Sequence, residues 1–141
     1  AGGTVRNSEV SQRFPGRVAV RWLDPTDVAE VLGSCDHGIL VREGSLTNRV
    51  ASPTKFAEYL NAGIPVIISP DLGDQTAEVE RERLGIVHRE DAVLPILARP
   101  TADERERLTA HAARQLTKPA FASQYSRIVQ ALTARSRCAS A

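Results

Sequence analysis

The sequence has few of the residues that would place it in a specialised class of protein. Its 141 residues include two cysteines, Cys35 and Cys138, which argues against a disulfide framework and predicts free thiols in a reducing, cytoplasmic compartment. No stretch approaches the ~20 apolar residues of a transmembrane segment. The net charge of +1 gives no electrostatic case for binding nucleic acid. We therefore expect a soluble protein, and the length suits a single domain.

One stretch organises the rest of the chain, and it covers residues 52–68, SPTKFAEYLNAGIPVII. It predicts a short helix that leads directly into a buried strand. Ser52 suits the N-cap and Pro53 the first helical position. Gly63 supplies the left-handed residue that ends the helix, and Pro65 prevents its continuation. The β-branched run after Pro65 is typical of a strand covered on both faces.

The predicted helix has an apolar face and a polar face. Phe56 and Leu60 fall on the core side, whereas Lys55 and Glu58 share another side at three-residue spacing. The free N–H groups from Ser52 to Lys55 form a candidate anion site, which the helix dipole strengthens. Glu58, one turn further, can accept two hydroxyls of a ribose. The alternative is a plain surface Lys–Glu pair, worth a few tenths of a kcal/mol.

The remaining pattern alternates strands with helices. Further strands are predicted at residues 17–23, 37–42 and 86–88. Further helices are predicted at 24–33 (opened by Asp24 and Pro25), about 76–84 (ended by Gly85), 101–116 (opened by a capping box) and from 118 onward. Residues 43–51 are expected to form a loop and 92–98 at most a short helix, whereas 1–16 are compatible with helix, coil or disorder. The last helix carries an apolar stripe of Phe121, Tyr125, Ile128, Val129 and Leu132.

This alternation predicts an α/β fold, with a Rossmann-like parallel sheet and flanking helices. Ligands of such sheets bind beyond the carboxyl ends of the strands. Arg42 and Glu43 follow one predicted strand, and Gly73 and Asp74 follow another. Arg42 suits a phosphate oxygen, although a surface pair with Glu43 or Asp36 is equally compatible with the sequence. Gly73 and Asp74 suit a substrate or, alternatively, a tight turn that Asp74 or Thr76 caps.

Other kinds of site have little support in the sequence. The three histidines have no metal-ligand spacing, no catalytic triad can be assembled, and neither common Gly-rich phosphate loop is present. We therefore expect no metal and no cofactor.

The stretch SPTKFAEYLNAGIPVI resembles the nucleotide-sugar-binding helix and following strand of GT-B-fold glycosyltransferases, close to the large retaining glycosyltransferase family 4. The resemblance covers roughly residues 17 to 90 and implies a C-terminal, nucleotide-sugar-binding domain. It places Ser52, Thr54 and Lys55 near the diphosphate and Glu58 on the ribose, and it favours Asn48 and Arg49 at the site. Val50 stands where the family often has an acidic residue that touches the donor sugar, and Glu43 is the candidate to replace it.

The resemblance implies transfer of a sugar from a nucleoside-diphosphate sugar to an acceptor hydroxyl, in a cleft between two domains. It also implies two sheet strands before residue 17, which the sequence does not reveal. We therefore expect a fragment that is inactive alone and is completed by an N-terminal domain or a second chain, as a homodimer or swapped assembly. The alternative is a non-catalytic nucleotide- or phosphate-binding module that regulates or scaffolds a partner. A sugar-nucleotide epimerase is a weaker third possibility.

Overall fold

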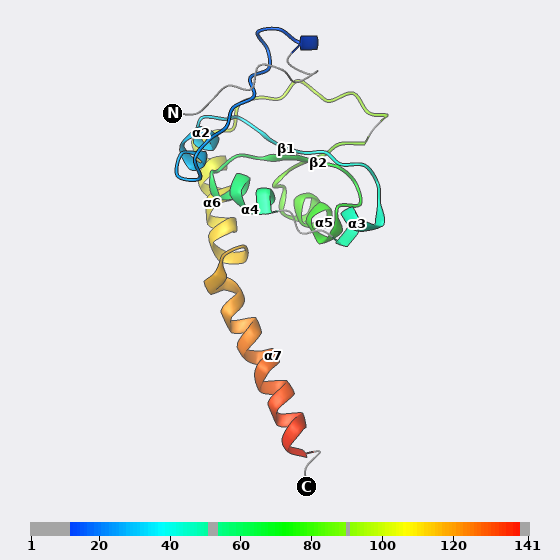
Figure 1. The fold of residues 1–141 in the computed structure, drawn as a ribbon, viewed down its shortest axis with the longest axis vertical. Helices are drawn as coiled ribbons and strands as arrows, with labels where there is room; N and C mark the ends of the chain where they lie inside the picture. Colours follow the sequence, from blue (N-terminus) through cyan, green and yellow to red (C-terminus); the bar gives the residue numbers. More distant parts are fainter. Residues whose placement is uncertain (1–11, 51–53, 90, 139–141) are drawn as a thin grey trace. The chain divides into compact units, whose positions relative to one another are not determined.

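The computed structural model describes residues 12–50, 54–89 and 91–138, and the chain divides into two compact units, 1–34 and 35–141 (Figure 1). The first unit contains helix α2 (Val28–Gly33). The sequence predicted that this helix begins at Asp24, which is wrong. The amide of Asp27 instead donates to the carbonyl of Asp24 at 2.9 Å and closes a turn, so the helix begins only after it. Residues 1–16, for which the sequence left helix, coil and disorder open, fall largely outside the described residues.

The strand predicted at residues 17–23 is also wrong. Within this range the structure has a bridge at Arg21 alone. Val18 and Val20 are half-buried, and Trp22 is 74% exposed. The alternating apolar pattern is real, but a strand also needs a neighbour for its backbone hydrogen bonds, which a local pattern cannot supply.

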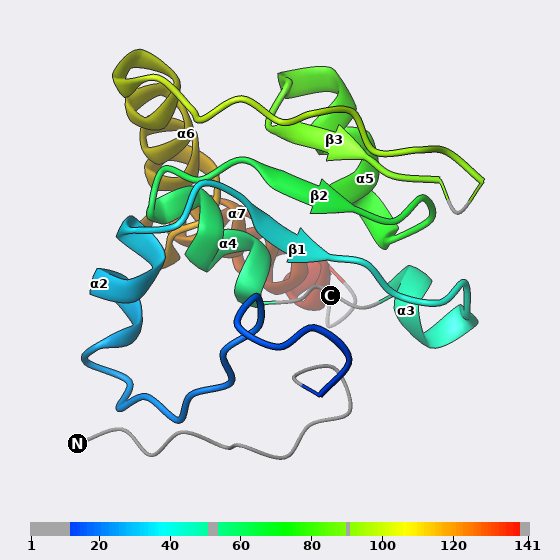
Figure 2. The same cartoon turned by 90° about the horizontal axis from the view of Figure 1, so that it is seen from above.

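The second unit is built on a parallel sheet, as the sequence predicted. The strands are β1 (Gly38–Leu40), β2 (Val66–Ile68) and β3 (Gly85–Val87), in the order β1-β2-β3 (Figure 2). Ile39 pairs with Ile67, and Ile67 pairs with Ile86. All of β2 is buried, which confirms the prediction that this strand is covered on both faces.

The helices that follow the strands lie on one side of the sheet, and the last of them projects away from it (Figure 1). They are α3 (Leu46–Val50), α4 (Thr54–Asn61), α5 (Gly73–Glu82), α6 (Ala102–Gln115) and α7 (Lys118–Cys138). Helix α4 contacts β1, β2 and α6, whereas α5 contacts β3 and α3. Residues 91–100, which connect β3 to α6, form neither helix nor strand. The unit is therefore an α/β structure with a parallel sheet and flanking helices, an arrangement compatible with a Rossmann-like fold.

The core lies between the sheet and these helices. Its fully buried side chains come from α4, β2, the turn before α5, α5 itself, the approach to β3, and α6; they include Phe56, Leu60, Val66, Ile68, Leu72, Val79, Leu84 and Leu108. Gly38 of β1 packs against the ring of Tyr59, where a Cβ would overlap the ring. The close approach of α4 to the sheet thus depends on a glycine in the strand.

The central helix ends as its sequence predicts. Gly63 has φ +71°, in the left-handed region, and the chain then passes through Pro65 into β2. The predicted N-cap, Ser52, and Pro53 lie outside the described residues. Helix α6 is also confirmed, because the Thr101 hydroxyl caps it by accepting from the amide of Glu104 at 3.2 Å.

Two boundaries differ from the sequence prediction. Residues 46–50, expected in a loop, form α3. Helix α5 begins at Gly73, not Thr76, and it is capped at its carboxyl end by Arg83, whose φ of 53° is left-handed. Gly85, predicted to stop this helix, instead belongs to β3, where a Cβ would overlap the carbonyl oxygen of Val66. The glycine serves close strand packing and not helix termination.

Among the helices of residues 12–50, 54–89 and 91–138, none is both long enough and apolar enough to cross a bilayer.

Candidate functional site

Ser69 joins the carboxyl ends of β1 and β2. Its side chain is 5% exposed, and its hydroxyl accepts from the amide of Arg42 and donates to the Arg42 carbonyl at 2.9 Å. The amide of Ser69 also donates to the carbonyl of Leu40 at 3.3 Å. These bonds fix the point at which the chain leaves β1, and therefore fix where the next residues lie.

Arg42, Glu43 and Asn48 form one connected group beyond that point. The Arg42 guanidinium donates to the Asn48 side-chain oxygen at 3.3 Å, and the Asn48 amide group donates to the Glu43 carbonyl at 2.7 Å. Asn48 lies on α3, which Figure 2 places beyond the arrowhead of β1. The structure thus brings these three predicted residues together at the carboxyl edge of the sheet.

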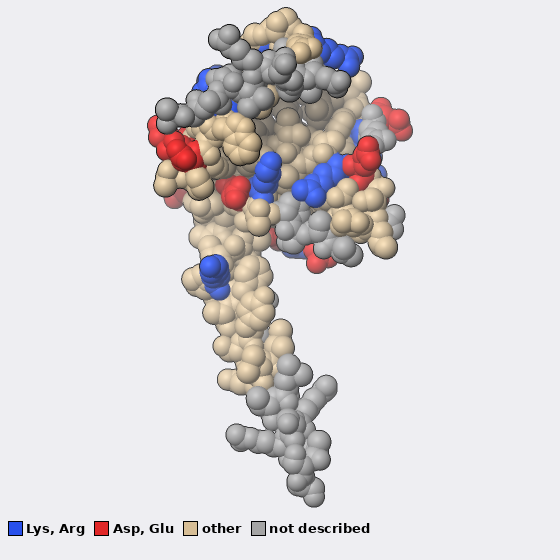
Figure 3. Space-filling model, viewed as in Figure 1, with Lys and Arg blue, Asp and Glu red and all other residues tan. Residues whose placement is uncertain are grey.

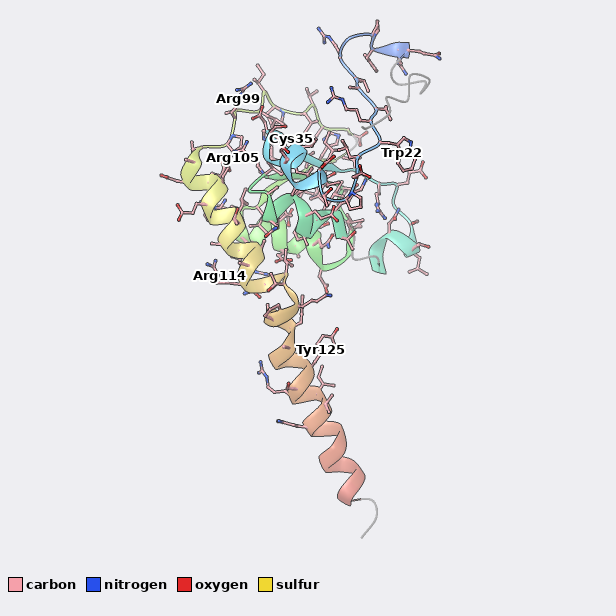
Figure 4. All side chains as sticks on the ribbon, turned by 60° about the vertical axis from the view of Figure 1, so that its left-hand side comes forward. Trp22, Cys35, Arg99, Arg105, Arg114 and Tyr125 are labelled. Carbon is pink, nitrogen blue, oxygen red and sulfur yellow. The ribbon has the colours of Figure 1, made fainter. Side chains whose placement is uncertain are left out.

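Asp36 does not pair with Arg42, as one interpretation of the sequence allowed. Its carboxylate lies 3.4 Å from Nε of Arg99 and 3.6 Å from a guanidinium nitrogen of Arg105. Arg105 also donates to the backbone oxygen of Cys35 at 2.8 Å, and Figure 4 labels these groups. Asp36 precedes β1, so this cluster lies at the opposite edge of the sheet from Arg42. The Arg42 guanidinium bonds to Asn48 instead.

The turn after β2 is closed by Thr76. Its hydroxyl donates to the Ser69 carbonyl and accepts from the Leu72 amide, both at 3.0 Å. Asp71 and Gly73 have φ of 60° and 55°, so the chain turns sharply into α5. The tight turn of the alternative interpretation is therefore present, but no side-chain cap is made at the N-cap position of α5, which is occupied by Leu72 and not by Asp74 or Thr76. Gly73 and Asp74 nevertheless lie at the start of α5, at the same edge as Arg42.

Helix α4 presents its polar residues to solvent. Thr54 and Lys55 are exposed in its first turn, and Glu58 is exposed one turn later. Ser52 lies outside the described residues. Among the residues that the structure describes, no ion pair or hydrogen bond joins Lys55 and Glu58. The surface-pair alternative is thus absent from this conformation.

Glu58 lines a cavity of about 230 Å³ between α4 and α6. Asn61, Ala112, Leu116 and Thr117 complete most of the wall. Since α4 ends at Gly63, next to the start of β2, its first turns lie toward the carboxyl ends of the strands. The carboxylate of Glu58 thus stands beside a hollow on the same side of the unit as Lys55.

The titration behaviour of one neighbour follows from its surroundings. Burial raises the pKa of the Tyr59 phenol above its usual value, and the nearby Glu58 and Cys35 act in the same direction. Tyr59 packs against Gly38 and the core, so its ring is held while Glu58, the preceding residue, faces solvent. The helix thus separates a neutral packed face from a charged one.

Charges of both signs meet at the carboxyl edge. Arg42 and Lys55 are cationic, whereas Glu43, Glu58 and Asp74 are anionic. Figure 3 shows basic and acidic side chains side by side on this part of the molecule. A mixed set of this kind can offer cations to a phosphate and carboxylates to hydroxyls.

A second cavity lies at the opposite, amino edge of the sheet. It has a volume of about 330 Å³, and its walls include His37, Arg83, Arg99 and the apolar Ile96. None of the residues predicted for the site lines it. The two edges of the sheet therefore offer separate surfaces.

Ser69 and Thr76 hold the edge together, but the sequence indicated no role for Ser69 and suggested Thr76 only as a cap for the following helix. Ser69 directly follows a strand of three apolar residues, and a small hydroxyl residue there can reach the neighbouring strand end. Its partner Arg42 is 27 residues away, so only the strand order could have indicated the contact.

Searches for related proteins found no matching family model, no matching curated protein and no matching solved structure.

Proposed function

We propose that this chain is the donor-binding part of a GT-B-type glycosyltransferase, which transfers a sugar from a nucleoside-diphosphate sugar to an acceptor hydroxyl. The observation that carries the proposal is the meeting of three polar segments at the carboxyl edge of a parallel sheet. They are the Arg42–Asn48 group, the first turns of α4 and the turn that opens α5. This is where α/β folds bind nucleotides.

The proposed diphosphate site combines charge with backbone N–H groups. Lys55 and Thr54 lie in the first turn of α4, where the helix dipole favours an anion. The Arg42 guanidinium is oriented by Asn48 and supplies a second cation. During transfer, negative charge builds up on the departing diphosphate, and these groups stabilise it electrostatically. Their contribution is thus both binding and rate.

Glu58 holds the nucleoside in this proposal. Its carboxylate is exposed beside the cavity between α4 and α6, one turn beyond Lys55, and two adjacent hydroxyls of a ribose can donate to it. This contact orients the donor without taking part in bond breaking. Glu43 takes the contact to the donor sugar, in place of the acid for which the chain has Val50.

Calorimetric titration with UDP, GDP and inorganic phosphate tests the proposal. One nucleoside diphosphate should bind more tightly than phosphate, and Glu58→Ala should weaken it by about 1–3 kcal/mol through loss of charge-assisted hydrogen bonds. Glu80→Ala removes an equally exposed carboxylate from α5 and should leave the affinity unchanged. Equal binding by both variants, or no binding of any nucleotide, would contradict the donor site.

The second candidate is a non-catalytic nucleotide- or phosphate-binding module. The specific observation in its favour is Val50 at the position of the family acid. An activity assay distinguishes the two proposed functions, provided that the chain is combined with the domain or second chain that binds the acceptor. Turnover of a nucleoside-diphosphate sugar supports the transferase, whereas binding without turnover supports the module.

A further inference from the structure

Helix α7 has an unusual charge composition for this protein. Its 21 residues, KPAFASQYSRIVQALTARSRC, include the basic residues Lys118, Arg127, Arg135 and Arg137 and no acidic residue. The other long helices, α5 and α6, each mix acidic and basic residues. A helix of this composition has a strongly positive potential along its whole length.

The same helix exposes an apolar stripe. Phe121, Tyr125 and Ile128 follow one another at four- and three-residue spacing and therefore share a face. Their exposed fractions are 39%, 67% and 55%. Figure 4 shows the labelled Tyr125 side chain projecting outward from α7. Stripes of this kind are normally covered, so the exposed one indicates a surface that meets another body.

The basic residues of α7 lie both opposite the apolar stripe and at its border. With about 3.6 residues per turn, position 127 lies on the side of α7 away from positions 121, 125 and 128. Arg127 is exposed there, and Lys118 is exposed at the start of the helix. The sequence continues the apolar spacing to Leu132, four residues after Ile128. By the same spacing, position 137 also lies away from the stripe, whereas positions 118 and 135 lie beside it. The helix thus combines an apolar stripe with two basic positions at its border and two on the opposite side.

We propose that α7 binds the surface of an anionic lipid bilayer, lying in the interface with its apolar stripe toward the acyl chains. Basic amphipathic helices with aromatic residues on the apolar side are typical of such binding. Phe121 and Tyr125 suit the boundary between acyl chains and head groups, where one end of a ring is apolar and the other polar. This inference does not rest on the proposed donor site.

Charge complementarity favours a bilayer over a second copy of the chain. Two α7 helices packed along their stripes would bring positions 118 and 135 of both copies to the border of the contact, with no acidic residue in either helix, which disfavours association. A bilayer that contains acidic lipids covers the apolar stripe and neutralises the cations at the same time.

The experiment measures co-sedimentation of the full chain with vesicles of phosphatidylcholine alone and of phosphatidylcholine with 30% phosphatidylglycerol. The α7 charge variant carries Lys118→Gln, Arg127→Gln, Arg135→Gln and Arg137→Gln. A matched control removes four arginines outside α7: Arg13→Gln, Arg17→Gln, Arg21→Gln and Arg89→Gln. Both variants lower the net charge equally. A second pair compares Ile128→Ser with Ile96→Ser, which replaces an isoleucine that is also exposed but lies outside α7.

Wild type should bind the acidic vesicles and bind the neutral ones weakly. Each basic residue near the surface contributes about fivefold, so the α7 charge variant should lose roughly a hundredfold or more, whereas its control keeps most of the binding. Ile128→Ser should weaken binding more than Ile96→Ser. Circular dichroism should show that all variants keep their helix content.

Three results would overturn the inference. One is the absence of binding to acidic vesicles by wild type. Another is an equal loss in the α7 charge variant and its control, which would mean that overall charge acts without α7. The third is a dimer in lipid-free sedimentation velocity that Ile128→Ser dissociates, because a second copy would then cover the stripe.

Discussion

Helices α4 and α7 carry the same kind of apolar stripe, yet only the stripe of α4 is covered. Phe56 and Leu60 of α4 have no exposed surface, whereas Phe121 and Tyr125 of α7 are 39% and 67% exposed. The stripe of α4 is covered because of the segment that follows this helix. Gly63 and Pro65 turn the chain from α4 directly into β2, so the helix packs on the sheet that it helps to form. A stripe thus predicts a buried face but does not identify the element that buries it.

The largest expected effect comes from exchanging phenylalanine for alanine on the two helices. Phe56→Ala should lower the free energy of unfolding by about 3–5 kcal/mol, because it leaves a cavity in the core. Phe121→Ala should cost less than about 1 kcal/mol, because the ring is already partly in water. Urea denaturation followed by circular dichroism measures both. Similar losses for the two variants would mean that α7 is as well packed as α4.

The close approach of the strands can be tested at a glycine. Gly85→Ala should destabilise the fold by about 1–3 kcal/mol, because the added methyl group meets the backbone of Val66. Gly44→Ala is the control, since a Cβ there has open space, and it should stay within about 1 kcal/mol of wild type. Thermal unfolding compares the two. A neutral Gly85→Ala would mean that β2 and β3 leave room for a side chain between them.

A hydroxyl at the carboxyl edge should matter more than one on α7. Ser69→Ala removes the group that both accepts from and donates to the backbone of Arg42, and should cost about 0.5–1.5 kcal/mol. Ser126→Ala removes an exposed hydroxyl from α7 and should change the stability by less than about 0.5 kcal/mol. Chemical denaturation resolves this difference. Equal effects would remove Ser69 from its positioning role.

The smallest effect concerns Tyr59 and appears only at high pH. Because burial raises the pKa of this phenol in the folded state, the unfolded chain loses its proton first as the pH rises. Stability should therefore fall above about pH 10, the usual pKa of tyrosine. Tyr59→Phe should reduce this fall, and Tyr125→Phe should leave it in place. Denaturation midpoints at about pH 8 and about pH 10.5, on either side of that pKa, test this. An unchanged fall in Tyr59→Phe would contradict it.

The sequence predicted best those parts of the fold that carry local helix-capping or helix-ending residues. Gly63 and Pro65 mark the end of α4, and Thr101 with Glu104 marks the start of α6. The strand expected at residues 17–23 failed because a strand depends on a partner elsewhere in the chain. Gly85 was misread because the same residue type ends helices and allows strands to pack closely.

The location of the candidate site could be predicted from the sequence, but the hydrogen bonds that position its residues could not. Parallel topology alone places Arg42 and Gly73 at one edge, since the strands that precede them end there. The contact between Arg42 and Asn48 depends on α3, which Ser45 caps by accepting from the Asn48 amide at 3.2 Å; the sequence had predicted a loop around this serine. The role of Ser69 depends on strand order, which the sequence did not specify.

The most direct test follows backbone amide resonances of the labelled chain during titration with the nucleoside diphosphate that binds best. The account predicts shifts at the carboxyl edge, in residues 42–48, 54–58 and 73–74. Amides beside the amino-edge cavity, at 96–99, and along α7, at 121–128, should stay in place. Shifts confined to residues 96–99, or no shifts at all, would contradict a donor site at the carboxyl edge.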